Sequence, residues 1–167
     1  MSIREEVTYR ATPQQVLDCF SDPDFLIARY NHVGAKNIII EEISRSGNQT
    51  EFTIKRDVPL NVPKFARKLI HPMTSIVHTE KIMLEEAGNL SGTTEFAVHG
   101  TPIRLEGSYQ VIAGRDGRGS LHRVEARVIA NIPLVGSKLA TFLEKDITPT
   151  LREELLFNQA ALVDLAD

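Results

Sequence analysis

Between residues 35 and 132, apolar and polar residues alternate almost without interruption. A period of two is typical of half-buried β-strands, because successive side chains point to opposite faces of a strand. Glycine-containing turns interrupt the pattern, which therefore predicts six strands, at residues 36–44, 49–57, 74–85, 92–98, 103–113 and 120–132. Short loops favour antiparallel pairing of consecutive strands, so this stretch predicts an antiparallel meander.

The chain before the meander predicts one more strand and two short helices. Residues 3–10 alternate in the same way and add an opening strand, which gives a strongly curved sheet of about seven strands. The segment TPQQ at residues 12–15 has the form of a capping box and starts a helix over residues 13–20. The segment SDP at residues 21–23 starts a second helix, which Gly34 ends.

The end of the chain predicts a long amphipathic helix lying across the sheet. Its apolar stripe recurs every four residues and is widened by further apolar positions. Pro149 lies inside the pattern and predicts a kink near residues 146–150, because proline removes one helical hydrogen bond and its ring clashes with the preceding turn. The stripe consists of Val135, Leu139, Leu143, Ile147, Leu151 and Leu155, widened by Phe142, Leu162 and Leu165.

Composition limits the classes of function. The chain has 167 residues, the length of one domain, and we expect residues 1–167 to form a single ligand-binding domain. The net charge of -3 makes nucleic acid an unlikely partner. Cys19 is the only cysteine; we expect it to be a packing residue, and with no targeting or membrane-spanning segment in the sequence we expect a cytoplasmic protein.

The predicted order of elements resembles that of the START-like (SRPBCC) superfamily, whose helix-grip fold is an α+β arrangement of a curved antiparallel sheet, two short helices after the first strand and a long C-terminal helix. Two local strings resemble a bacterial branch known only as a domain of unknown function. They are VPKFARKLI at residues 62–70, which leads into TEK at residues 79–81, and IPLVGSKL at residues 132–139. The resemblance implies an apolar ligand, lipid-like or polyketide-like, held between the sheet and the last helix, and it supplies no catalytic residues.

The motifs of common catalytic and metal sites are missing from the sequence. The five histidines lie on different predicted elements and none is at metal-ligand spacing from another, so we expect no metal and no cofactor. We assign no catalytic residue.

Strand parity predicts which side chains face the space between sheet and helix. Three polar side chains, those of Arg56, Tyr109 and His122, fall on otherwise apolar inner rows, where they could orient a small ligand or lie at the rim as ordinary structural residues. The complete set of candidate ligand-binding residues is Phe52, Ile54, Arg56, Phe65, Leu69, Leu105, Gly107, Tyr109, His122, Val124, Ala126, Leu139 and Leu143.

The segment at residues 59–72 is longer than a hairpin requires and predicts a short amphipathic helix. Its apolar residues Phe65, Leu69 and Ile70 are expected to pack inward as a lid over the ligand. Its basic residues, Lys64, Arg67 and Lys68, leave open a second interpretation, a docking face for a membrane surface or a partner.

We therefore expect a non-enzymatic carrier or sensor of a hydrophobic small molecule. One alternative is a cyclase or aromatase that uses His122 and Tyr109 in proton transfer. Another is a protein-interaction module whose groove is filled by side chains. The sequence leaves the ligand and the oligomeric state open.

Overall fold

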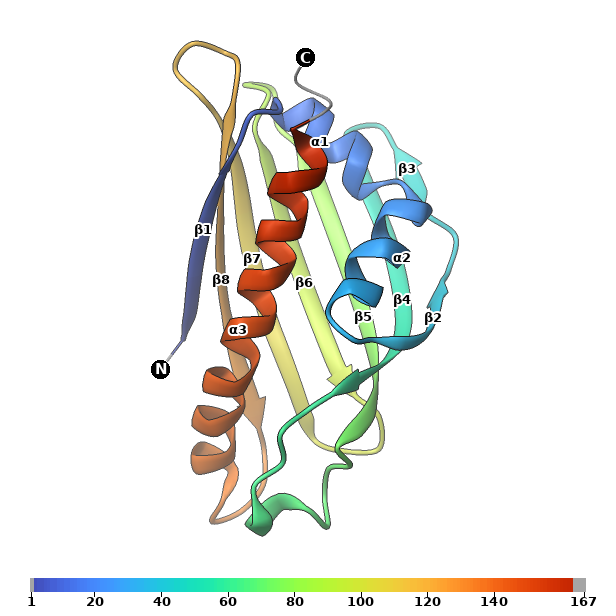
Figure 1. Ribbon diagram of the computed structural model, residues 1–167, viewed down its shortest axis with the longest axis vertical. Coiled ribbons are helices and arrows are strands. Elements are labelled where there is room, and N and C mark those ends of the chain that lie inside the picture. The colour runs from blue at the N-terminus through green and yellow to red at the C-terminus, as the bar shows by residue number, and fades with distance from the viewer. Residues whose placement is uncertain (1, 164–167) are drawn as a thin grey trace.

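The computed structural model describes residues 2–163, in which a curved antiparallel sheet lies against three α-helices (Figure 1). The helices are α1 (Pro13–Phe20), α2 (Pro23–His32) and α3 (Gly136–Leu162), and a 3-10 turn, η1, spans Lys64–Ala66. The strands are β1 (Ile3–Tyr9), β2 (Lys36–Ile40), β3 (Ser44–Ser46), β4 (Gln49–Pro59), β5 (Met73–Leu84), β6 (Leu90–Val98), β7 (Ile103–Ala113) and β8 (Ser120–Ala130).

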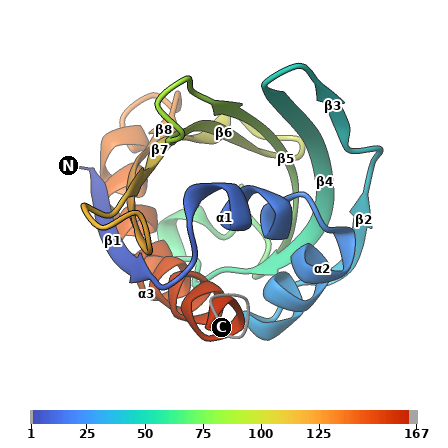
Figure 2. The same ribbon diagram turned by 90° about the horizontal axis from the view of Figure 1, so that it is seen from above.

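The sheet follows the predicted meander, with the opening strand added at its far edge. Its order is β1-β8-β7-β6-β5-β4-β2, with β3 paired to β4, and every pair is antiparallel. Figure 2 shows the sheet curving around α1, while α2 and α3 close the remaining side. The concave face of the sheet is thereby covered, and the predicted helix-grip fold is confirmed.

Most strand bounds differ from the predicted ones by one or two residues, and two strands differ in a way that alters the sheet. The stretch at residues 36–44 forms two strands instead of one, because β2 ends at Ile40 and β3 begins at Ser44. Within β2, Asn37 adopts a positive φ of 53° and the register against β4 shifts between Lys36 and Ile39. The sheet therefore has eight strands. The last strand ends at Ala130, and Ile132 lies in the turn that leads into α3.

The predicted helix starts are confirmed. The Thr12 hydroxyl accepts from the Gln15 amide, while the Gln15 side chain accepts from the Thr12 amide at 2.9 Å, so both halves of the capping box form. Asp22 caps α2 by accepting from the Asp24 amide at 3.0 Å.

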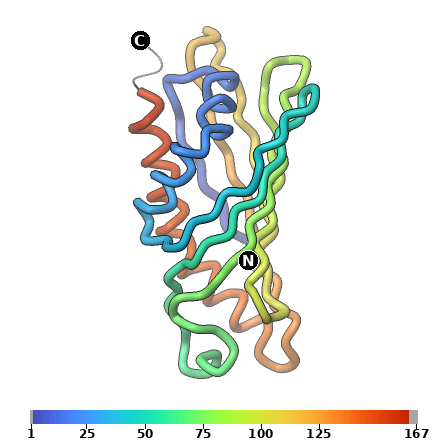
Figure 3. The backbone as a smooth tube through the Cα atoms, turned by 90° about the vertical axis from the view of Figure 1, so that its right-hand side faces the viewer, coloured from blue at the N-terminus to red at the C-terminus, as the bar shows by residue number. Residues whose placement is uncertain are grey.

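Helix α3 stays helical through Pro149 and bends in that region. Figure 3 shows the change of direction between its first turns, in orange, and the remainder, in red. Pro149 lacks the N–H that would bond one turn back. The stripe residues Leu139, Leu143 and Leu155 are buried, whereas Leu165 lies outside the described residues.

The buried apolar residues form two clusters along the inside of the sheet. The upper cluster lies beneath α1 and α2 and includes Phe20, Phe52 and Val111. The lower cluster joins the first half of α3 to the loop before β5, and includes Leu139 and Ile70.

Candidate functional site

A cleft of about 110 Å³ opens between the inner face of the sheet, the end of α2 and the middle of α3. Its walls are mainly apolar, with a few polar groups gathered on the side of α3 and β4. It is lined by Tyr30, Val33, Ala35, Arg56, Val58, Pro59, Leu60, Ile76, Phe96, Val98, Ile103, Arg104, Leu105, Val128, Leu143, Asp146, Ile147, Thr150 and Glu154.

Only part of the predicted set lines this cleft. Arg56, Leu105 and Leu143 do so. The others lie elsewhere: Phe52, Ile54, Tyr109, His122 and Val124 lie in or against the upper core, Ala126 and Leu139 belong to the lower cluster, and Gly107 is half-buried beside Thr94 and Ala126.

The loop before β5 holds the remaining two predicted residues. Phe65 and Leu69 are 37% and 42% exposed, whereas Ala66 and Ile70 point into the lower cluster. Instead of the predicted amphipathic helix, the loop has the short 3-10 turn η1, followed by hydrogen bonds from the Leu69 and Ile70 amides to the Ala66 carbonyl.

Arg56 is the principal polar group of the cleft. Its guanidinium carbon lies 3.8 Å from the ring centroid of Tyr30 and 5.3 Å from that of Phe96, so aromatic faces hold the cation in place. One guanidinium nitrogen, Nη1, lies 3.0 Å from Nδ1 of His78. Burial lowers the pKa of Arg56, although an arginine in this setting remains charged. Among the described residues, its other N–H groups have no hydrogen-bond partner and are available to a ligand.

His78 connects Arg56 to polar groups in the interior of the protein. Arginine can only donate, so Nδ1 of His78 accepts and its proton must be on Nε2. That Nε2–H donates to Glu80 across 3.0 Å, and the Tyr109 hydroxyl donates to the other Glu80 oxygen across 2.7 Å. Burial lowers the pKa of His78 to about 4, so the ring is neutral at pH 7.

Glu80 is a buried carboxylate that two donors stabilise. Burial alone would raise its pKa, but the hydrogen bond from His78, the charge of Arg29 and the hydroxyl of Tyr109 outweigh it and leave the pKa below the ordinary value. Tyr109 reaches Glu80 by leaning over Gly92: a Cβ at that position would lie 2.1 Å from the tyrosine ring. Gly92 therefore positions Tyr109.

A second buried chain of polar groups runs beneath α3. Asn158 donates to the Tyr9 hydroxyl at 3.1 Å, and that hydroxyl lies 2.7 Å from Nδ1 of His122. The Nε2 of His122 is buried and has no hydrogen-bond partner in the described part of the chain. Burial lowers the pKa of His122 to about 3. Neither His122 nor Tyr109 is among the residues that line the cleft, so neither reaches it as a proton donor or acceptor.

Glu154 faces the cleft from α3. Burial raises its pKa, against the opposing charges of Arg29 and Arg56, and no ion pair or hydrogen bond holds its carboxyl among residues 2–163. Asp146, Thr150 and Glu154 recur every four residues beside the apolar stripe, a spacing that could have identified this polar edge from sequence. Asp146 also accepts two hydrogen bonds from Asn61, at 3.1 Å from its backbone amide and 2.8 Å from its side chain, which joins the loop before β5 to α3.

A wider depression of about 760 Å³ lies on the outer face of the sheet. Its charged side chains pair with one another, as in Arg4 with Glu125 at 3.1 Å and Arg123 with Glu6 at 3.5 Å. Within residues 2–163, no cluster of three or more metal-ligating side chains occurs, and no helix is long and apolar enough to span a membrane.

Residues 4–161 match the family model described as "Protein of unknown function (DUF2505)". A search of curated proteins found no match.

Several solved structures share the fold. A START superfamily protein from Mycobacterium smegmatis is similar with a TM-score of 0.57 at 15% identity, covering 98% of each chain. A STAR-related lipid transfer protein from Xanthomonas axonopodis has a TM-score of 0.56 at 14% identity, covering 95% of this chain and 84% of that one. A norcoclaurine synthase from Thalictrum flavum has a TM-score of 0.54 at 11% identity, covering 100% of this chain and 96% of the other.

Proposed function

The chain belongs to the DUF2505 family, and from the geometry of its cleft we propose that it binds one small, mainly apolar molecule between the sheet and α3, as a carrier or sensor. The observation that supports this proposal is an apolar cleft lined by two ionisable side chains, those of Arg56 and Glu154, neither of which forms an ion pair with any residue in the described range 2–163. Apolar walls with a few convergent polar groups are typical of small-molecule sites.

These two groups define the polar part of the ligand. A carboxylate ligand that accepts from Arg56 would be repelled by an ionised Glu154, and an amine would be repelled by Arg56 and Arg29. A neutral hydroxyl avoids both costs, because it accepts from Arg56 and donates to Glu154. We therefore propose an apolar alcohol or enol as the ligand class.

The size of the cleft implies movement. Its volume of about 110 Å³ is below the roughly 300–1,000 Å³ of typical ligand pockets, so a lipid-sized ligand requires the cleft to widen. The loop that begins at Pro59 and Leu60 borders the cleft and is joined to α3 through Asn61 and Asp146. We propose that the cleft opens when the two hydrogen bonds between Asn61 and Asp146 break.

The similar folds are consistent with both binding and catalysis, since one of them is a lipid transfer protein and another is a synthase. The cyclase alternative relied on His122 and Tyr109. It is disfavoured because both side chains are buried away from the cleft and the Tyr109 hydroxyl is held by Glu80. Geometry must bring an acid or base to the substrate before its pKa matters.

Displacement of the neutral dye Nile red tests the ligand class. Decanol and decanoic acid have the same chain length, and we expect decanol to displace the dye at concentrations at least tenfold lower at pH 8. Glu154→Gln should reduce this preference, whereas Glu153→Gln on the exposed side of α3 should leave it unchanged. Equal displacement by the two compounds would contradict the proposed class.

A further inference from the structure

One end of the molecule carries an exposed surface that the cleft does not explain. It consists of the loop at residues 60–72 and the turn at residues 131–138, which we call the tip. Figures 1 and 3 show both segments at the end opposite the β7–β8 hairpin. They are in contact, because the ammonium of Lys138 lies 4.5 Å from the ring centroid of Phe65.

Leu134 protrudes from the tip at a conformational cost. Its side chain is fully exposed, and its φ is 72°, in the left-handed region that favours glycine. The Val135 amide donates to the Pro133 carbonyl at 2.9 Å, which makes Leu134 the centre of a tight γ-turn of the strained kind. Within the part of the chain that the structure describes, no apolar burial of Leu134 compensates for this strain. Strain of this type is concentrated at functional sites.

Further apolar side chains surround Leu134 on the same end of the molecule. Phe65, Leu69 and Met73 are each between 37% and 42% exposed. A group of large apolar side chains at one end of a fold indicates a surface that meets an apolar phase.

The charge of the tip is opposite to that of the whole chain. Lys64, Arg67, Lys68 and Lys138 lie on its two segments, where the sequence has no Asp or Glu, although the chain has a net charge of -3. None of the four makes an ion pair with any residue in the described range 2–163. Four unpaired cations among exposed apolar side chains are complementary to a bilayer that offers acyl chains beneath anionic head groups.

We propose that the tip docks on an anionic lipid bilayer, with Leu134 and Phe65 inserted and the cations on the lipid head groups. Leu60 both begins the tip and lines the cleft, so docking brings the edge of the cleft to the lipid surface. The inference concerns the tip alone and holds whichever ligand the cleft takes.

Flotation with vesicles tests the proposal. The full chain should bind vesicles of phosphatidylcholine and phosphatidylglycerol in equal parts, and bind phosphatidylcholine alone at least tenfold more weakly. Reversing two charges at the tip, Lys64→Glu with Lys68→Glu, should weaken binding to the anionic vesicles at least tenfold. The matched control, Arg115→Glu with Arg118→Glu in the hairpin at the opposite end, changes the net charge equally and should alter binding less than twofold.

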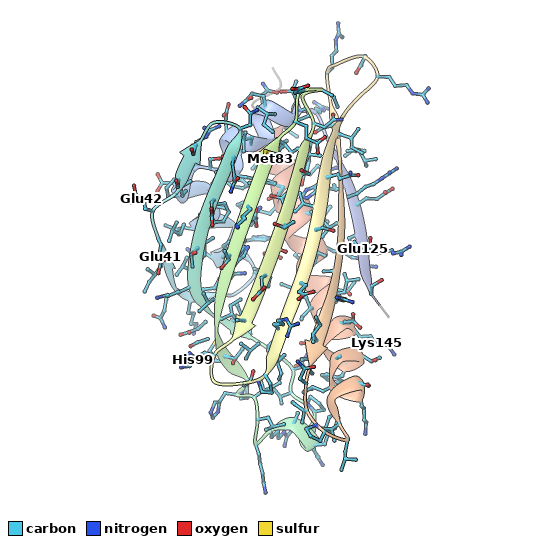
Figure 4. The ribbon with its side chains drawn as sticks, turned by 180° about the vertical axis from the view of Figure 1, so that it is seen from behind. Glu41, Glu42, Met83, His99, Glu125 and Lys145 are labelled. Atoms are coloured by element: carbon cyan, nitrogen blue, oxygen red, sulfur yellow. The ribbon has the colours of Figure 1, made fainter. Side chains whose placement is uncertain are left out.

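Leu134→Gly separates docking from folding. Glycine tolerates the positive φ, so this variant should melt at the same or a higher temperature while binding vesicles several-fold more weakly. Met83→Asp changes an apolar residue that is 41% exposed near the opposite end (Figure 4), and this variant should bind as the wild type does. The proposal would be overturned if the wild-type protein did not bind anionic vesicles, or if the tip and control variants weakened vesicle binding equally.

Discussion

Arg56 and His78 share a hydrogen bond of 3.0 Å that determines where the histidine carries its proton. Because the guanidinium has no acceptor, the contact requires a neutral ring protonated on Nε2. The same ring then donates to Glu80, so a cation at the cleft is linked through one imidazole to a buried carboxylate. A ligand that binds Arg56 therefore affects this series of hydrogen bonds from Arg56 through His78 to Glu80.

The first prediction concerns the charge of His78. With its pKa lowered to about 4 by burial, the ring should remain neutral and Nε2-protonated from pH 8 to pH 5. Nitrogen chemical shifts of the imidazole measure both the tautomer and the titration. Free imidazole in the same buffer serves as the reference. A titration of His78 near pH 6.5 would refute the assignment.

The second prediction concerns stability and pH at His122. Its pKa is about 3 in the folded protein and about 6.5 when unfolded, so below pH 6.5 the unfolded chain binds the additional proton. The contribution of neutral His122 is therefore complete above pH 6.5 and is lost as the pH falls toward 3.

Urea unfolding of wild type and His122→Gln measures this contribution. The free energy of unfolding of the wild type, relative to the variant, should fall by about 2 kcal/mol between pH 7 and pH 5. Taking the difference cancels the other titrating groups, including Glu154, whose raised pKa acts in the opposite direction. A pH-independent difference for His122→Gln would contradict the prediction.

The third prediction concerns Gly92. In Gly92→Ala the new methyl would meet the ring of Tyr109, so the ring must move and Glu80 loses a donor. Overpacking together with a lost charged hydrogen bond should lower the free energy of unfolding by about 2–4 kcal/mol. The neighbouring Ser91→Ala should cost less than about 1 kcal/mol. Equal stability of the two variants would show that Tyr109 does not depend on Gly92.

The fourth prediction concerns the loop that borders the cleft. Asn61→Ala removes the side-chain hydrogen bond to Asp146, so the loop should open more readily. Amide exchange at residues 64–70 should become several-fold faster, and a bound displacer such as decanol should slow it in the wild type. Strand β8 (Ser120–Ala130) provides the internal reference. If amide exchange in this loop responds neither to Asn61→Ala nor to decanol, the loop is not the segment that moves.

The sequence predicted the fold because strand parity and helix capping are local properties. Parity placed Arg56 and Leu105 on inner rows, which burial supports. Parity does not say how far along a strand the cleft lies, since that depends on where α2 and α3 cross the sheet. Tyr109 and His122 therefore share the inner face with the cleft residues but lie in the closed upper core.

Other parts of the site depended on contacts distant in sequence. Glu80 shares an inner row with His78 two residues away on β5, but only the pairing of β5 with β6 and of β6 with β7 brings it to Tyr109. At residues 59–72, one short 3-10 turn stands where a longer amphipathic helix was expected, and Phe65 and Leu69 are exposed. Neither feature is contained in a local pattern of apolar residues.

The occupant of the cleft is tested most directly by native mass spectrometry of the purified chain with one equivalent of decanol. Val98→Phe adds a ring to the cleft wall, while Ala97→Phe adds one to the opposite face of the same strand. We predict a one-to-one complex of decanol with the wild type and with Ala97→Phe, and no complex with a folded Val98→Phe. Absence of any complex with the wild type, or equal binding by Val98→Phe, would contradict it.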